Sequence, residues 1–262
     1  MCHDTDSRPP APPDDAVQDP RELAARRELQ LTSADGTSVA AYEAVPSGSP
    51  RARIVVLPDV RGLHPYYRAL AERLAETGLH AVAVDYFGRT AAGVPRDDDF
   101  EYMPHVRQVT PHQVAADVAA AARHLSTDTA QPVFTVGFCF GGAHSWRLAV
   151  AGLGEGSALA GAIGFYGRPA LVDEALAQSD RAPAPVLMLV AGADKATPVE
   201  DSLALADRLR AKGAEVETHV FDGAPHSFFD RAFDEHQQAY EDAWRYLLSF
   251  VGRHAAASPR QG

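Results

Sequence analysis

The stretch that decides the fold is Val133-Phe134-Thr135-Val136-Gly137-Phe138-Cys139-Phe140-Gly141-Gly142. Its first four residues are β-branched or aromatic and predict a buried strand, whereas the residues that follow Gly142 predict a helix. A chain that turns at once from strand to helix strains the backbone of the residue at the turn. Glycines on both sides of Cys139 remove the side chains that would collide there. The pattern Gly-x-Cys-x-Gly-Gly therefore predicts a nucleophile elbow with sulfur in place of the usual serine oxygen.

Cys139 is predicted to project from this elbow at the N-terminus of a helix. The partial positive charge at a helix N-terminus stabilises a thiolate, so we expect a nucleophilic sulfur. The alternative is a small buried hydrophobic residue in a glycine-rich turn, because free cysteine is among the most buried residue types. The chain has 2 cysteines, Cys2 and Cys139, which excludes a disulfide framework.

Short apolar runs alternate with helical patterns through the middle of the chain. This alternation predicts an α/β fold, with a mostly parallel central sheet flanked by helices on both faces. An opening hairpin is predicted around Asp35-Gly36. The runs typical of strands are 54–57, 81–84, 133–136, 162–165, 186–190 and 216–221.

One domain over residues 21–253 accounts for these elements, because no linker or internal repeat divides them. Residues 1–20 are rich in proline and aspartate and are predicted to be a disordered tail. Residues 254–262 lack periodicity and are predicted to be a loose C-terminal tail. Within the domain, residues 86–109 form a long aperiodic segment, which is either a lid or binding loop or a tolerated surface insertion.

The composition narrows the possible partners. Of the 262 residues, 46% are hydrophobic, and 24 basic against 35 acidic residues give a net charge of −11. Such a chain is repelled by phosphate backbones and anionic lipid, so we expect neither nucleic acid nor a membrane as partner. No apolar run approaches the roughly 20 residues of a spanning helix, and the N-terminal residues lack a signal-peptide pattern. The predicted location is cytoplasmic, and both a monomer and a homodimer remain open.

Two polar residues follow later predicted strands, at positions where the acid and base partners of an elbow nucleophile are expected. Asp194 lies in the turn after the strand that ends near Val190, and His226 lies in the loop after Phe221. In the elbow architecture the acid and the base follow the nucleophile in this order, each beyond a strand end. Each residue alone could be an ordinary turn or loop residue, but together they predict a Cys139-His226-Asp194 triad. No histidine pair has metal-ligand spacing, so neither a metal nor a cofactor is expected.

These motifs make the sequence resemble the dienelactone hydrolase (carboxymethylenebutenolidase) family of α/β-hydrolases. The resemblance runs from about Ala52 to Phe250, and its strongest pieces are 137–142, 192–194 and 225–228. It implies an α/β-hydrolase fold, with Cys139 as nucleophile, His226 as base and Asp194 as the residue that orients the base.

The resemblance also implies roles around the triad. Asp59 stands where the family has an acidic residue, usually glutamate, that is thought to keep the resting thiol neutral until substrate arrives. Tyr166 matches the family's strand end beside the site. Arg107, in the long segment, and Arg231, after His226, are candidates for binding a substrate carboxylate.

The function predicted from these features is hydrolysis of a small-molecule ester or lactone through a thioester acyl-enzyme. The backbone N–H groups of Phe140 and Val60 are the expected oxyanion hole. A thioesterase or broad carboxylesterase on the same fold is one alternative. A non-catalytic hydrolase-like binding protein or a thiol redox sensor that uses Cys139 is the other.

Overall fold

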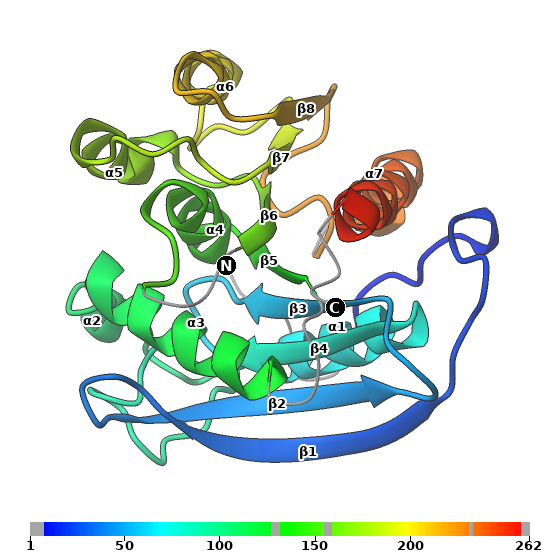
Figure 1. Ribbon diagram of the computed structural model, residues 1–262, viewed down its shortest axis with the longest axis vertical. Coiled ribbons are helices and arrows are strands. Elements are labelled where there is room, and N and C mark those ends of the chain that lie inside the picture. The colour runs from blue at the N-terminus through cyan, green and yellow to red at the C-terminus, as the bar shows by residue number, and fades with distance from the viewer. Residues whose placement is uncertain (1–7, 127–131, 155–158, 231–232, 258–262) are drawn as a thin grey trace.

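The computed structural model describes residues 8–126, 132–154, 159–230 and 233–257. These residues form one eight-stranded sheet, in the order β1-β2-β4-β3-β5-β6-β7-β8 (Figure 1). The opening hairpin pairs antiparallel with the rest of the sheet, and β3 to β8 run parallel. The predicted mostly parallel α/β sheet is confirmed. The strands are β1 (Leu23–Thr32), β2 (Ser38–Pro46), β3 (Ala52–Leu57), β4 (Leu79–Val84), β5 (Val133–Phe138), β6 (Leu159–Phe165), β7 (Val186–Ala191) and β8 (Val216–Phe221).

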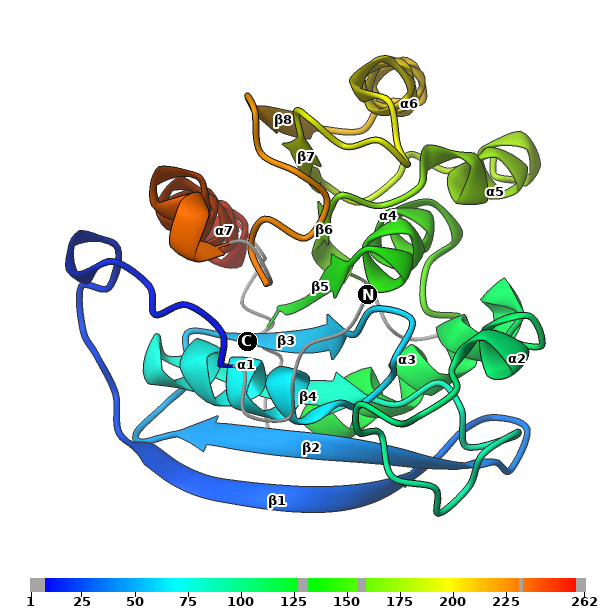
Figure 2. The same cartoon turned by 180° about the vertical axis from the view of Figure 1, so that it is seen from behind.

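Helices cover both faces of the sheet because alternate residues of the buried strands point to opposite sides. In β3, Ile54 and Val56 pack in the core with α1 (Pro65–Glu76) and α7 (Gln237–Ala257). Val55 and Leu57 face the other side, which is covered by α3 (Pro111–Leu125), α4 (Phe140–Ala151) and α6 (Val199–Ala211), as Figures 1 and 2 show. The remaining helices are short: α2 (Met103–Val106), α5 (Asp173–Gln178), η1 (Asp14–Ala16), η2 (Pro169–Val172) and η3 (Phe233–Glu235).

The carboxyl ends of the parallel strands meet along one edge of the sheet. The loop after β3, Cys139 after β5, Tyr166 after β6, Asp194 after β7 and His226 after β8 all follow such ends. In open α/β sheets this edge is where ligands bind. The parallel topology therefore brings to one edge two candidates, Asp59 and His226, that are 167 residues apart in the sequence.

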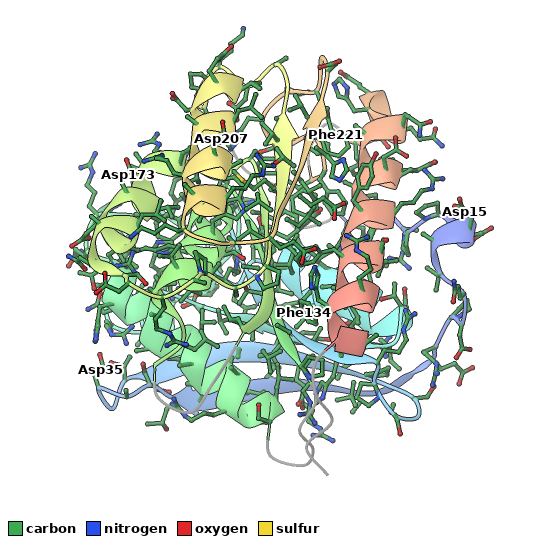
Figure 3. The ribbon with its side chains drawn as sticks, turned by 45° about the horizontal axis from the view of Figure 1, so that its top comes forward. Asp15, Asp35, Phe134, Asp173, Asp207 and Phe221 are labelled. Atoms are coloured by element: carbon green, nitrogen blue, oxygen red, sulfur yellow. The ribbon has the colours of Figure 1, made fainter. Side chains whose placement is uncertain are left out.

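The two ends of the chain are more ordered than the sequence predicts, within the part that the structure describes. Residues 8–20 pack on α7: the indole N–H of Trp244 donates to the Pro10 carbonyl (3.1 Å), and Arg245 pairs with Asp15, which Figure 3 shows beside this helix. A buried indole N–H needs an acceptor, and this proline-rich segment supplies one. Similarly, α7 extends to Ala257, beyond the predicted end at residue 253. Residues 1–7 and 258–262, the outer parts of both predicted tails, lie outside the described residues.

The aperiodic segment 86–109 folds back onto the sheet. Phe87, Ala91 and Phe100 are buried in the core against α3, and α2 forms near the end of the segment. Arg96 ion-pairs with Asp85 at the end of β4, over 2.8 Å. Buried aromatic residues anchor the segment although it has no helical or strand period. In the described part of the chain, no helix has both the length and the apolar character of a membrane span.

Candidate active site

Cys139 lies in the turn between β5 and α4 with φ 52° and ψ −109°. The turn is possible because glycines line it. A Cβ on Gly137 would lie 2.0 Å from the carbonyl oxygen of Gly141, and one on Gly141 would lie 2.1 Å from the carbonyl oxygen of Leu57. Any side chain at either position would overlap backbone atoms. The sequence therefore folds locally as a sharp strand–turn–helix elbow, with Cys139 at its apex.

Three non-glycine residues in the described chain have positive φ: Cys139 (52°), Tyr166 (37°) and Ser227 (64°). Tyr166 lines the same cavity as Cys139, and Ser227 follows His226 directly. Such conformations cost about 1–3 kcal/mol each and cluster where function requires them. Within the described residues, the strained non-glycine backbone is therefore concentrated at the edge of the sheet where β5, β6 and β8 end.

His226 and Asp194 form a hydrogen-bonded pair. The distance from His226 Nδ1 to Asp194 Oδ2 is 2.6 Å, and the exposed fractions of the two side chains are 31% and 2%. The other carboxylate oxygen, Oδ1, accepts the N–H groups of Ala196 (2.8 Å) and Thr197 (3.2 Å), which fixes the orientation of the carboxylate. A carboxylate accepts hydrogen bonds, so the proton of the neutral ring is on Nδ1 and Nε2 is left as the basic nitrogen.

The loop that carries His226 is anchored by its own sequence. Phe228 and Phe229 follow it and are fully buried in the core cluster that also contains Trp244. His226 itself contacts the ring of Tyr166, with 4.9 Å between the ring centroids. Two buried phenylalanines on one side and an aromatic contact on the other hold an otherwise irregular loop in place.

Cys139 and His226 line one cavity of about 430 Å³, called here the Cys139 cavity. Its wall is mainly apolar. The residues around the two candidates are Val60, Met103, Val106, Phe140, Ala143, Tyr166, Arg168, Leu171, Ala196 and Thr197. The volume and the apolar wall suit a small organic ligand with a few polar groups. Met103 and Val106 come from α2, so segment 86–109 forms part of a binding wall.

The thiol of Cys139 is less acidic than the elbow pattern predicts. Burial raises its pKa to about 12, and the negative charge of Asp59 acts in the same direction. Asp230 and Asp194 add smaller effects, whereas a hydrogen bond from the backbone N–H of Phe140 lowers the pKa. Desolvation and nearby carboxylates thus outweigh the helix N-terminus and favour the neutral thiol, which is the resting form that the family resemblance implies beside an acidic residue such as Asp59. Asp59 is buried (5% exposed), and its Oδ1 accepts the N–H of Arg61 (2.9 Å).

The dienelactone hydrolase family model matches residues 39–255 of the chain. The chain belongs to this family. A "Putative carboxymethylenebutenolidase" of Escherichia coli O157:H7 is 31% identical over 234 residues, which cover 82% of each chain. The carboxymethylenebutenolidase of Rhodococcus opacus is 27% identical over 260 residues, 97% of each chain. A dienelactone hydrolase-like promiscuous phosphotriesterase from metagenomic libraries has the same fold, with a TM-score of 0.70, 23% identity and coverage of 88% and 99%.

In this dienelactone hydrolase family member, the arginine that lines the Cys139 cavity among the described residues is Arg168, which is neither of the two arginines predicted from the sequence. Arg107 is exposed at the end of α2 and is absent from the wall of the Cys139 cavity. Arg231 lies outside the described residues. Arg168 is the arginine among the described residues that line the cavity, and its position directly after the Gly164-Phe165-Tyr166-Gly167 stretch was a signal that could have revealed it.

Three further candidates of this family member, Val60, Phe140 and Tyr166, lie in the wall of the cavity. Val60 and Phe140 are both lining residues, and Phe140 begins α4, so its N–H is one of the four without an intrahelical acceptor. Tyr166 is 2% exposed, and its hydroxyl has no hydrogen-bond partner among the described residues. A buried hydroxyl without a partner costs about 1–3 kcal/mol.

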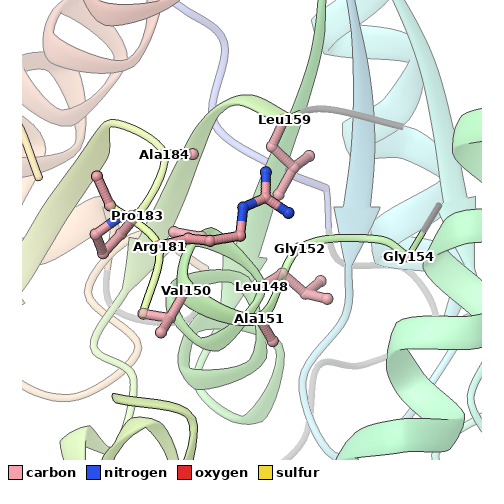
Figure 4. Close-up of a pocket in the computed structure, with 11 residues that line it drawn as sticks. Leu148, Val150, Ala151, Gly152, Gly154, Leu159, Arg181, Pro183 and Ala184 are labelled. Atoms are coloured by element: carbon pink, nitrogen blue, oxygen red, sulfur yellow. The ribbon is translucent and has the colours of Figure 1, made fainter. Parts of the chain in front are cut away.

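A second cavity of about 400 Å³ lies at the opposite end of α4, close to where β6 begins (Figure 4). Leu148, Leu159 and Arg181 line it, and it shares no described lining residue with the Cys139 cavity. It contains none of the candidate residues. Among the described residues, no group of three or more histidine, cysteine, aspartate or glutamate side chains is arranged to hold a metal ion.

Proposed function

We propose that this dienelactone hydrolase family member hydrolyses small esters or lactones, with Cys139 as the nucleophile. The observation that supports this most is the Asp194–His226 hydrogen bond of 2.6 Å, because His226 lines the same cavity as Cys139. An orienting acid, a base with a free Nε2 and a thiol at a strained elbow together make the constellation of nucleophilic acyl transfer.

In the proposed first step, Nε2 of His226 takes the proton of the Cys139 thiol as the sulfur attacks the carbonyl carbon. The carbonyl oxygen becomes an oxyanion, and the N–H groups of Phe140 and Val60 stabilise it. The tetrahedral intermediate collapses, the ester C–O bond breaks, and His226 gives its proton to the leaving alkoxide. Asp194 stabilises the imidazolium that exists between these transfers.

The second half returns the enzyme to its starting state. His226 takes a proton from water, and the hydroxide formed attacks the thioester carbonyl. The C–S bond then breaks, the carboxylic acid leaves, and Cys139 regains its proton. With a resting thiol pKa of about 12, proton removal accompanies attack and does not precede it. In this proposal the charge of Asp59 helps to keep the resting thiol protonated.

The lining of the cavity favours an apolar acyl group. Val60, Met103, Val106 and Leu171 supply hydrophobic surface, which also suits a thioesterase or a broad carboxylesterase on this fold. A panel of p-nitrophenyl esters of increasing acyl length, with carboxylate-bearing lactones and acyl thioesters beside them, separates these substrates. A redox sensor is less well supported, because a sensor needs an acidic thiol and burial makes Cys139 a weaker acid.

The test is turnover of a small p-nitrophenyl ester by Cys139→Ala, Asp194→Asn and a matched Cys2→Ser control. We expect Cys139→Ala to abolish the esterase activity and Asp194→Asn to reduce kcat by about 10⁴, as in triads that lose the orienting acid. Cys2→Ser should be unchanged. Full turnover by Cys139→Ala would rule out the proposed nucleophile.

A further inference from the structure

The loop after β3, residues 58–64, carries Val60. Hydrogen bonds to two residues that follow β4 hold this loop near both of its ends. On one side, the hydroxyl of Tyr86 donates to the Pro58 carbonyl (2.9 Å). On the other, Asp85 Oδ1 accepts the N–H of Leu63 (3.1 Å). Gly62, with φ +70°, allows this approach, since a Cβ there would lie 2.3 Å from Asp85 Oδ1. Val60 thus lies between two anchored backbone positions.

Asp98, in the middle of segment 86–109, makes a further link to the same loop. Its Oδ1 forms an ion pair with Nη2 of Arg61 and lies 3.3 Å from Nε2 of His64. Arg61 and His64 are buried (1% and 0% exposed), whereas the side chain of Asp98 is 35% exposed. Nη2 of Arg61 also lies 3.5 Å from the carbonyl oxygen of Asp97.

The protonation of His64 follows from its second contact. Its Nδ1 accepts the N–H of Tyr66 at the start of α1 (3.2 Å), so in the neutral ring the proton is on Nε2. Nε2–H therefore points to the Asp98 carboxylate. One carboxylate oxygen thus receives hydrogen bonds from two buried residues of the loop, of which Arg61 is the immediate neighbour of Val60.

The same segment also reaches the substrate side. Met103 and Val106, five and eight residues after Asp98, line the Cys139 cavity together with the loop residue Val60. The ring of Tyr86 contacts Phe140, with 5.4 Å between the centroids. Segment 86–109 therefore contacts the loop of one expected oxyanion donor, contacts the other donor directly, and provides apolar wall.

We propose that Asp98 is a positioning residue for the oxyanion hole: by holding Arg61 and His64, it fixes the backbone that presents the Val60 N–H. This inference rests on the proposed esterase function. Asp98 touches neither the substrate nor the reacting atoms and acts through Arg61. A displaced oxyanion donor weakens binding of the transition state more than binding of the substrate, so the loss should fall on kcat.

The experiment compares Asp98→Asn with wild type on p-nitrophenyl butyrate. We expect kcat to fall by about 10- to 100-fold, the range for a misplacement of order 1 Å, with KM within about twofold. A trifluoromethyl ketone, which forms a tetrahedral adduct with a thiol, should bind more weakly by the same factor as kcat/KM falls. Asp98→Glu, which keeps the charge, should recover part of the loss.

Asp99→Asn is the matched control, since it removes an exposed carboxylate from the neighbouring position, and it should behave as wild type. Thermal unfolding of each variant distinguishes a fall in kcat caused by displacement of the loop from one caused by loss of the folded state. An unchanged kcat in Asp98→Asn, an equal loss in Asp99→Asn, or a change confined to KM would overturn the inference. If Cys139→Ala is inactive while Asp98→Asn is fully active, the proposed function stands and only the role of Asp98 fails. Full turnover by Cys139→Ala would remove both.

Discussion

The resting thiol of Cys139 gives a quantitative prediction about pH. With a pKa of about 12, about 1 thiol in 10⁴ is ionised at pH 8, against about 1 in 10 for a thiol at the ordinary value of 9.0. A thiolate of higher pKa is the better nucleophile, and for 3 pKa units this recovers about 20-fold. Reaction with a disulfide reagent should therefore be about 50-fold slower than that of an ordinary thiol before any steric effect.

The assay is the rate of reaction with 2,2′-dithiodipyridine from pH 6 to 10.5, in a Cys2→Ser background so that Cys139 reacts alone. The shape of the profile is independent of access, and the rate should still be rising at pH 10. Asp59→Asn removes the second-largest cause of the raised pKa and should shift the profile to lower pH, whereas Asp59→Glu should shift it less. A plateau below pH 8.5, or no effect of Asp59→Asn, would refute the reasoning.

Three further predictions concern other parts of the molecule. Arg168→Gln should raise KM for a carboxylate-bearing ester by about tenfold, because one charge-assisted contact is lost, and should leave KM for the matched neutral ester unchanged. Equal effects on both esters would exclude an anion subsite at Arg168. Gly141→Ala places a Cβ 2.1 Å from the carbonyl oxygen of Leu57. The free energy of unfolding in urea should fall by about 3 kcal/mol or more, and the esterase activity should fall as well. Wild-type stability of this variant would contradict the elbow geometry. Hydrogen bonds from His80 and His124 to the buried carboxylate of Glu43 lower its pKa from 4.5 to about 2, so this stabilisation is complete above pH 4.5 and disappears as the pH falls toward 2. Glu43→Gln should therefore cost up to about 3 kcal/mol at pH 7 and much less at pH 3, and a cost that does not depend on pH would disprove the linkage.

The sequence predicts the elements whose signals are local. The strand before Gly137 and the glycines around Cys139 specify the elbow without knowledge of the rest of the fold. Asp194 and His226 follow from the rule that functional residues lie beyond the ends of parallel strands, and the structure places these two side chains in hydrogen-bond contact.

The features that the sequence does not predict depend on tertiary contacts. Helix position alone suggests a Cys139 thiolate, and the family resemblance points to Asp59 as the residue that opposes it, but the burial that raises the thiol pKa most depends on tertiary packing. Arg107 and Arg168 both carry a guanidinium near candidate motifs, and only the path of the chain shows that Arg168 reaches the cavity. The contact between Asp98 and the loop 58–64 joins positions more than 30 residues apart, and no periodic pattern in the sequence predicts it.

The central claim is that an acyl group is carried by Cys139 during turnover. Rapid quenching into acid during hydrolysis of a p-nitrophenyl ester, followed by intact-mass analysis and peptide mapping, measures this directly. We predict an added mass equal to the acyl group on the peptide that contains Cys139, formed within the first turnover and absent in Cys139→Ala. An acyl group on another residue, or catalytic turnover by Cys139→Ala at the wild-type rate, would contradict the account.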